Sequence, residues 1–145
     1  MIQRIQTLFL AFASGTFFGQ FGLAFATSDK SESGIFADML YNIHDHVGLL
    51  IVTVLGALVS LGAIFLYKNR LLQMRIAYLG IVLAVILPTL ALLLFFSAGY
   101  KLDSTNAVQD SLGIYLPIVS VFLLALAARF INKDEKLVRS SDRLR

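Results

Sequence analysis

The densest group of potential metal ligands in the chain is the segment His44-Asp45-His46. Imidazole and carboxylate groups bind zinc or copper. The two histidines would point to opposite sides of a helix but to the same side of an extended segment. A metal site would therefore need an extended backbone and a third ligand, for which Asp38, Asp103 and Asp110 are candidates. The alternative is a polar start to a helix, where Asp45 suits the helix dipole.

Other recognisable chemistry is scarce in the sequence. The chain has no cysteine, which excludes disulfides, thiolate metal sites and thiol redox chemistry. It has no glycine-rich loop of the P-loop or dinucleotide-binding type. A serine nucleophile would need a nearby base, and the long apolar stretches contain no His or Lys. We therefore expect no enzymatic activity and no cofactor.

The composition predicts a membrane protein. Hydrophobic residues make up 58% of the 145 residues and charged residues 14%, and the mean hydropathy is +0.81. A soluble domain of this size could not bury so much apolar surface. Four long apolar stretches approach the roughly 20 residues that a bilayer-spanning helix needs. We expect an all-α domain over residues 1–131, with spans at 5–27, 46–67, 75–99 and 111–131. Short connections favour an up-down-up-down four-helix bundle.

The first span has a rival interpretation. Arg4, the apolar run after it and Ala24-Phe25-Ala26 are typical of a signal peptide with its cleavage site. The run is longer than a usual signal-peptide core, and glycines and Gln20 interrupt it. We therefore expect a retained helix, with Gln20 as the deepest strongly polar group inside the membrane. Its amide is expected to bond a neighbouring helix.

The charges predict the orientation of the spans. Ten of the twelve Lys and Arg residues, with three acids, fall on the side that holds both termini. The other side has two basic and six acidic residues. Because Lys and Arg mark cytoplasmic segments, both termini are expected in the cytoplasm. The net charge of +3 therefore reflects topology and indicates no nucleic-acid partner.

Small residues and prolines indicate how the spans pack. The helix-packing candidates are Gly15 and Gly19 in the first span, Gly56 and Ser60 in the second and Gly80 in the third. Such spacing lets helix backbones approach closely, within one chain or across a homo-oligomer seam. Pro88 and Pro117 remove backbone donors and predict kinks in the third and fourth spans.

Two segments outside the spans have helical signatures. Ile35, Phe36, Met39, Leu40 and Ile43 share one helical face, which predicts a short interfacial helix near 34–43 on the outer side. Asn132 is followed three residues later by Glu135, a variant of the capping box. The tail 132–145 is thus expected to be helical, and its basic residues favour anionic headgroups or a membrane-protein partner.

The two ends carry a family resemblance. The opening residues MIQRIQT and the closing residues KDEKLVRSSDRLR resemble those of an uncharacterised family of small four-span inner-membrane proteins from Bacteroidetes-type bacteria. The resemblance implies a location in the bacterial inner membrane and an uncleaved first helix, and it supplies no activity or substrate. It also implies that the tail is specifically constrained, with Arg139, Asp142, Arg143 and Arg145 as the expected contact surface for a partner or lipid.

Three functional hypotheses follow. The first is a non-catalytic accessory or scaffold subunit of a larger membrane assembly, which the bare spans and the patterned tail favour. The second is a small transporter or lipid-handling protein, which the two prolines and the glycine faces favour. The third is an outer-face metal or ligand sensor that uses His44 and His46.

Overall fold

The computed structural model describes residues 2–29, 34–99 and 108–142, and most of them are helical. The four long helices are α1 (Ile2–Gly19), α2 (Val47–Phe65), α3 (Arg70–Ser97) and α4 (Tyr115–Asp142). A short 3-10 helix, η1 (Leu112–Ile114), leads into α4. The described strands are β1 (Ala26–Ser28), β2 (Leu40–Tyr41) and β3 (Val108–Asp110). The fold is mostly helical, as predicted, but it also includes a small sheet that we did not predict.

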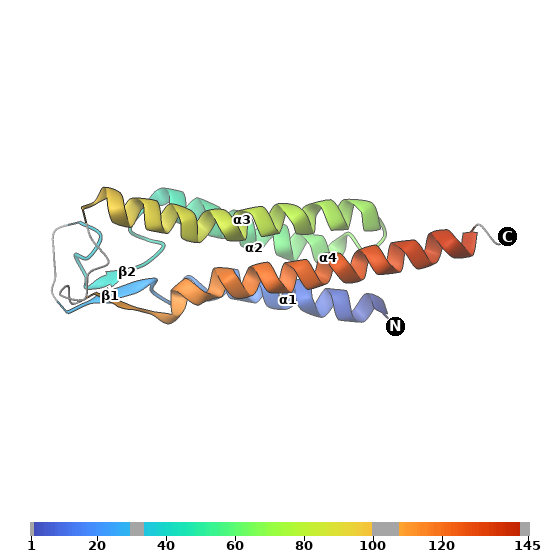
Figure 1. Cartoon of the computed structure of the whole chain (residues 1–145), viewed down its shortest axis with the longest axis horizontal. Helices are drawn as coiled ribbons and strands as arrows, with labels where there is room; N and C mark the ends of the chain where they lie inside the picture. Colours follow the sequence, from blue (N-terminus) through green and yellow to red (C-terminus); the bar gives the residue numbers. More distant parts are fainter. Residues whose placement is uncertain (1, 30–33, 100–107, 143–145) are drawn as a thin grey trace.

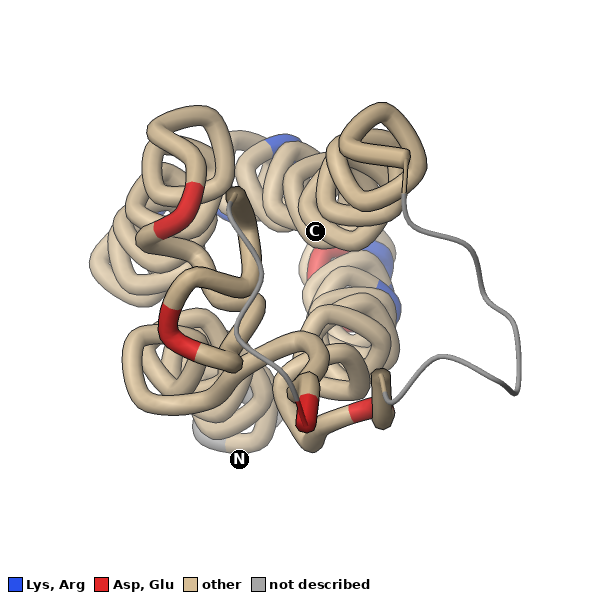
Figure 2. Tube along the Cα trace, turned by 90° about the vertical axis from the view of Figure 1, so that its left-hand side faces the viewer, with Lys and Arg blue, Asp and Glu red and all other residues tan. Residues whose placement is uncertain are grey.

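The four helices lie side by side along the long axis of the molecule (Figure 1). α1 packs against α2 and α4, and α3 packs against the same two helices. Seen along the long axis, the helices surround a common centre (Figure 2). Each helix contributes a fully buried leucine to this core: Leu10, Leu49, Leu87 and Leu124. The start of α1 and the end of α4 lie at the end opposite the sheet (Figure 1).

Polar caps determine where α2 and α3 begin. Nδ1 of His46 accepts a hydrogen bond from the Gly48 N–H at 3.0 Å. Oδ1 of Asn69 accepts one from the Leu72 N–H at 3.2 Å. Both side chains satisfy amide groups that have no carbonyl partner within the helix.

The sheet joins the segments that follow α1 and α3. Its strand order is β2-β1-β3, and both pairings are antiparallel. Ala26 lies opposite Tyr41 on one side and opposite Asp110 on the other. At the base of the sheet, the Phe25 N–H donates to the Tyr41 carbonyl at 2.6 Å, and the Ser111 N–H donates to the Phe25 carbonyl at 3.0 Å. These long-range hydrogen bonds hold together the segments that connect the helices at one end of the molecule.

The predicted interfacial helix at 34–43 is wrong. Residues 35–38 form a turn, and Leu40–Tyr41 pair as β2. Gly34 has a φ of 122° and Met39 a φ of 63°, and both values lie outside the right-handed helical region. Phe36 and Ile43, whose spacing suggested a helical face, are fully buried, but both lie in turns. The predicted first span continued to residue 27, but α1 ends at Gly19. Residues 26–28 belong to β1 of the sheet instead.

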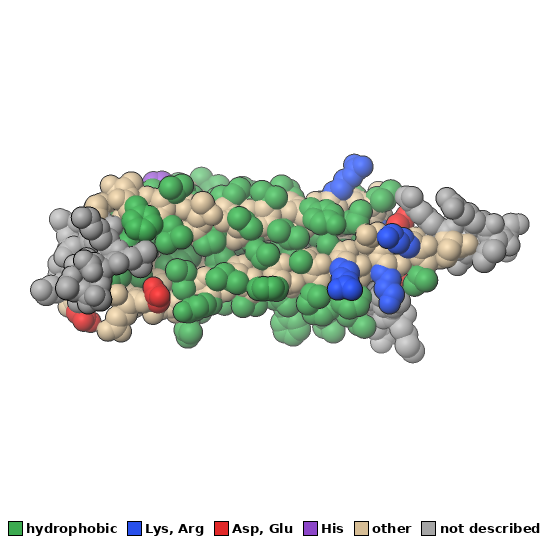
Figure 3. All heavy atoms as spheres, in the orientation of Figure 1, with side chains coloured by type: hydrophobic (Ala, Val, Ile, Leu, Met, Phe, Trp, Pro, Cys, Tyr) green, Lys and Arg blue, Asp and Glu red, His purple; other side chains and the backbone are tan. Residues whose placement is uncertain are grey.

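The surfaces of the helices are largely hydrophobic (Figure 3). α2, α3 and the segment Leu112–Val138 are each long and apolar enough to cross a bilayer. The apolar part of α1, Ile5–Gly19, is shorter. These helices are those of an integral membrane protein.

Charged side chains lie at the two ends of the molecule. At the end where α4 finishes, which we call the basic end, the described cations are Lys68, Arg70, Arg75, Arg129, Lys133 and Lys136 (Figure 3). At the sheet end, which we call the acidic end, the described carboxylates are Asp29, Asp38, Asp45 and Asp110 (Figure 2). The basic end also holds Asp134 and Glu135, so charge of both signs meets there.

Candidate binding sites at the two ends of the molecule

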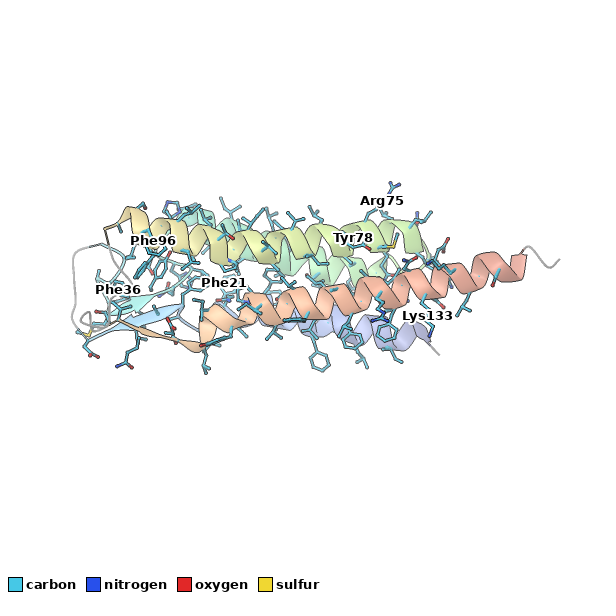
Figure 4. The ribbon with its side chains drawn as sticks, viewed as in Figure 1. Phe21, Phe36, Arg75, Tyr78, Phe96 and Lys133 are labelled. Atoms are coloured by element: carbon cyan, nitrogen blue, oxygen red, sulfur yellow. The ribbon has the colours of Figure 1, made fainter. Side chains whose placement is uncertain are left out.

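An apolar cavity of about 50 Å³ lies at the acidic end, between the sheet and the helices. All three strands, α3 and η1 contribute to its wall, which includes Phe25, Tyr41, Pro88, Leu92, Phe95 and Asp110. Figure 4 shows the aromatic side chains gathered at this end, with Phe36 beside the sheet and Phe96 on α3. Cavities lined by aromatic side chains with few polar groups are the usual form of a small-ligand site.

Tyr41 holds the wall of this cavity together. Its hydroxyl donates to the Ala91 carbonyl at 2.8 Å. Its ring centroid lies 5.6 Å from that of Phe25, 6.1 Å from Phe36 and 6.4 Å from Phe95. Burial, and then the negative charge of Asp45, raise the pKa of the Tyr41 phenol above its ordinary value. The phenol is therefore neutral at physiological pH and serves as a hydrogen-bond donor.

Gln20 anchors the end of α1 to the start of α4. Its side chain is 1% exposed, and Nε2 donates to the Gly113 carbonyl at 2.7 Å. A Cβ atom at position 113 would collide with the Ala24 carbonyl, so this close contact requires glycine. Pro117 follows in the first turn of α4, where a missing N–H breaks no helical hydrogen bond. Pro88 lies inside α3, and the Thr89 hydroxyl donates to the Val85 carbonyl at 2.8 Å.

The predicted packing residues have different surroundings. Phe17 of α1 packs directly on Gly56, while Gly80 of α3 lies close to Leu124 and to Ser60. Gly19 lies beside Leu116 of α4. Gly15, in contrast, has open space around it and is exposed. The packing partners of Gly19, Gly56 and Gly80 lie within this chain.

The segment His44-Asp45-His46 lies immediately before α2, and His46 is the N-cap residue of that helix. His46 uses Nδ1 for the helix cap, and the His44 ring lies edge-on to Phe21 with centroids 6.1 Å apart. Asp45 Oδ2 accepts from the Asn42 N–H at 2.6 Å, and burial raises the pKa of this carboxyl. In the parts of the chain that the structure describes, no three His, Asp or Glu side chains lie close enough to hold a metal ion. His44 and His46 both make contacts within the fold, and these contacts require no metal ion.

An open groove forms the second candidate site, at the basic end. It runs between the α2–α3 connection and the last turns of α4, and it is lined by Tyr67, Lys68, Asn69, Arg70, Leu71, Glu135 and Val138. Arg70 Nε lies 3.1 Å from Asp134 Oδ2, which ties the start of α3 to α4 beside the groove. Residues 135–142 continue α4 beyond this ion pair (Figure 1). The groove combines apolar side chains with charges of both signs.

Two buried glutamines at this end were not foreseen from the sequence. Gln6 and Gln73 are 0% exposed, and Gln73 Nε2 donates to the Ala63 carbonyl at 2.9 Å. Among the described residues, Gln73 Oε1 and both amide atoms of Gln6 have no hydrogen-bond partner, although these atoms are buried. The sequence did not predict their burial, because a polar residue near the end of an apolar stretch more often lies at the level of the lipid headgroups.

The contact surface predicted for the tail is only partly visible. Arg139 and Asp142 belong to α4, and their side chains lie outside the described part of the structure. Arg143 and Arg145 lie outside the described residues altogether. The third-ligand candidate Asp103 also lies outside them.

A family comparison covers nearly the whole of this architecture. A family model described as a domain of unknown function (DUF4293) matches residues 2–144. The chain belongs to this family. Comparison with curated proteins and with solved structures finds no match. The DUF4293 description assigns no activity.

Proposed function

We propose that the protein is a non-catalytic accessory subunit of a larger assembly in the bacterial inner membrane. In this arrangement the four helices cross the bilayer as an up-down bundle, with the basic end and both termini in the cytoplasm. The lysines and arginines at the basic end support this orientation, because cytoplasmic segments are rich in them. With 18 residues, α1 would be about 27 Å long at 1.5 Å per residue, close to the roughly 30 Å hydrocarbon core.

The orientation can be tested directly because the chain has no native cysteine. Single cysteines at Lys136 and at Asp38 should react differently with a membrane-impermeant maleimide. We expect the cysteine at position 38 to react in cells with a permeable outer envelope, and the cysteine at position 136 to react only after the inner membrane is opened. The reversed pattern would contradict the proposed orientation.

The groove at the basic end is the main support for the accessory role. Residues 135–142 of α4 extend past the Arg70–Asp134 ion pair, so in the cytoplasm this segment is exposed to water. Leu137 is 48% exposed and Val138 is 38% exposed on it. The projecting helix has apolar side chains, and the groove beside it also contains charged ones. This surface fits a partner segment that has both apolar and charged residues.

A photo-crosslinking residue at Val138 tests this role in native membranes. We expect it to capture another protein, and the gently solubilised complex to exceed the 16.0 kDa of the chain. A photo-crosslinking residue at Leu93, which is 62% exposed on α3, is the lipid-facing control. Val138→Asp should release the partner, whereas Ser140→Asp, on the same segment, should not. A monomer with no protein crosslink from Val138 would count against the proposal.

The cavity at the acidic end favours a second candidate function, the handling of membrane lipids. Leu92 both lines the cavity and is 41% exposed on α3, so a lipid beside α3 has access to it. In reconstituted vesicles, a lipid-handling protein should accelerate movement of a fluorescent phospholipid between leaflets. Ala91→Leu, which fills the cavity, should slow that movement. No acceleration over empty vesicles would remove this candidate.

A further inference from the structure

We propose that the cavity at the acidic end seats the ammonium group of a zwitterionic phospholipid from the outer leaflet. This inference rests on the proposed membrane placement and deepens the second candidate function by naming a ligand class. The gradient of polarity along the cavity, the character of its wall and its size support this assignment.

The cavity changes from apolar to charged along the membrane normal. Pro88 and Phe95 on α3 both line it, and they are about two helical turns apart, which corresponds to roughly 10 Å. Pro88 marks the deeper level and Asp110, on β3, the level of the sheet. A lipid beside α3 has the same gradient, with its chains toward the membrane centre and its headgroup toward the sheet.

The charge of the wall selects a cation. Among the described residues that line the cavity, Asp110 is the one with a charged side chain. Tyr41 is neutral because its hydroxyl is bound to the Ala91 carbonyl in a buried setting. The negative charge of Asp45, which also acts on the Tyr41 phenol, adds to the negative potential. An anionic headgroup would be repelled, whereas a cation gains attraction from Asp110.

The rings of the wall favour an ammonium group in particular. Phe25, Tyr41 and Phe95 all line the cavity, and the Phe25 and Tyr41 ring centroids are 5.6 Å apart. Ammonium groups bind the faces of aromatic rings, with about 0.5–2 kcal/mol per contact. A cluster of rings with one carboxylate therefore recognises an amine that carries apolar carbon atoms.

The size of the cavity limits how much of the lipid enters. A volume of about 50 Å³ admits a few water-sized probes and not a whole lipid. An ethanolammonium group, with two carbons and one nitrogen, is of this order. The acyl chains would remain in the bilayer along Leu92 and Leu93, which are 41% and 62% exposed.

Native mass spectrometry of the full chain with two lipids of identical chains tests this ligand class. Phosphatidylethanolamine should bind about fivefold more tightly than phosphatidylglycerol, a ratio that corresponds to about 1 kcal/mol. Asp110→Asn should abolish the preference without unfolding, because Asp110 is exposed. Asp29→Asn, an exposed carboxylate at the same end that does not line the cavity, is the matched control. Ala91→Leu should lower binding of phosphatidylethanolamine.

A photo-crosslinking residue at Leu92 keeps the test decisive if Ala91→Leu fails to fold. It should capture phosphatidylethanolamine, and free ethanolamine should not compete with the lipid. Equal binding of the two lipids, the same loss of preference in Asp29→Asn, or full competition by free ethanolamine would overturn the inference. In that case the accessory role would stand, provided that the cysteine-labelling pattern is as expected. A reversed labelling pattern would instead contradict the placement on which both proposals rest.

Discussion

The ring of Phe17 on α1 lies in the space that a side chain at Gly56 on α2 would occupy. Phe17 is 1% exposed, so the ring is held on all sides and cannot move into solvent. The absence of a Cβ at Gly56 thus sets the distance between α1 and α2, as small residues do between membrane helices.

Gly56→Ala should therefore destabilise the protein. The added methyl collides with the Phe17 ring, and overpacking of this kind typically costs about 1–3 kcal/mol. This exceeds the gain of about 1 kcal/mol that alanine brings to a helix over glycine. Thermal unfolding in detergent should show a lower midpoint for Gly56→Ala than for the wild type.

Gly62→Ala is the matched control on the same helix, because open space surrounds Gly62. It should leave the midpoint unchanged or raise it. Phe17→Leu should relieve the collision, so the double variant should be more stable than the sum of the single effects predicts. Equal midpoints for Gly56→Ala and Gly62→Ala would show that the packing of the Phe17 ring does not require glycine at position 56.

The buried glutamines should respond differently to replacement by leucine. Gln20→Leu removes the hydrogen bond to the Gly113 carbonyl and leaves that acceptor unpaired, so the free energy of unfolding should fall by about 1–3 kcal/mol. Gln6→Leu removes an amide that has no hydrogen-bond partner among the described residues, so it should leave stability unchanged or raise it. Chemical unfolding of both variants in one detergent measures the difference. A large loss in Gln6→Leu would mean that its amide has a partner, such as a bound water.

The apolar stretches were sufficient to predict the long helices, but not the structure between them. α2 and α3 lie close to the predicted spans because continuous apolar sequence has no other stable form in a membrane. The sheet escaped prediction because its pairing is non-local: Ala26 faces Asp110, and neither strand is long enough to show an alternating pattern. The spacing of Phe36 and Ile43 fits a helical face, yet these residues are buried in two separate turns.

The candidate sites were harder to predict than the fold for the same reason. Tyr41, Ala91 and Asp110 form one cavity wall although they come from three distant segments. Gln6 and Gln73 are polar residues that the sequence gives no reason to bury. His46 was predicted as a metal ligand or a polar helix start, and its hydrogen bond to Gly48 is that of a helix cap.

The raised pKa of Tyr41 predicts a loss of stability at high pH. The folded state holds the phenolic proton more tightly than the unfolded state, whose pKa is near 10.0. The stabilising contribution of Tyr41 is therefore complete below pH 10 and is lost as the pH rises beyond it. Tyr41→Phe should be less stable than the wild type at neutral pH, by about 1 kcal/mol for the lost bond to Ala91. The gap between the two should narrow above pH 10.

Tyr115→Phe is the control for the change from tyrosine to phenylalanine, because Tyr115 is 53% exposed. At neutral pH it should cost less stability than Tyr41→Phe. A gap between the wild type and Tyr41→Phe that stays constant above pH 10 would contradict the burial of the Tyr41 proton.

The cap that His46 provides predicts which of the two histidines matters for folding. His46→Ala should lower the free energy of unfolding by about 0.5–2 kcal/mol, because the Gly48 N–H loses its acceptor. His46→Asn should restore most of that loss, since asparagine is a strong N-cap residue. His44→Ala, which removes only the edge contact with Phe21, should cost less. Isothermal titration with Zn²⁺ on the same variants separates the cap from a metal site. A structural cap predicts no zinc heat in the wild type, whereas a metal ligand pair predicts wild-type binding that both His44→Ala and His46→Asn abolish.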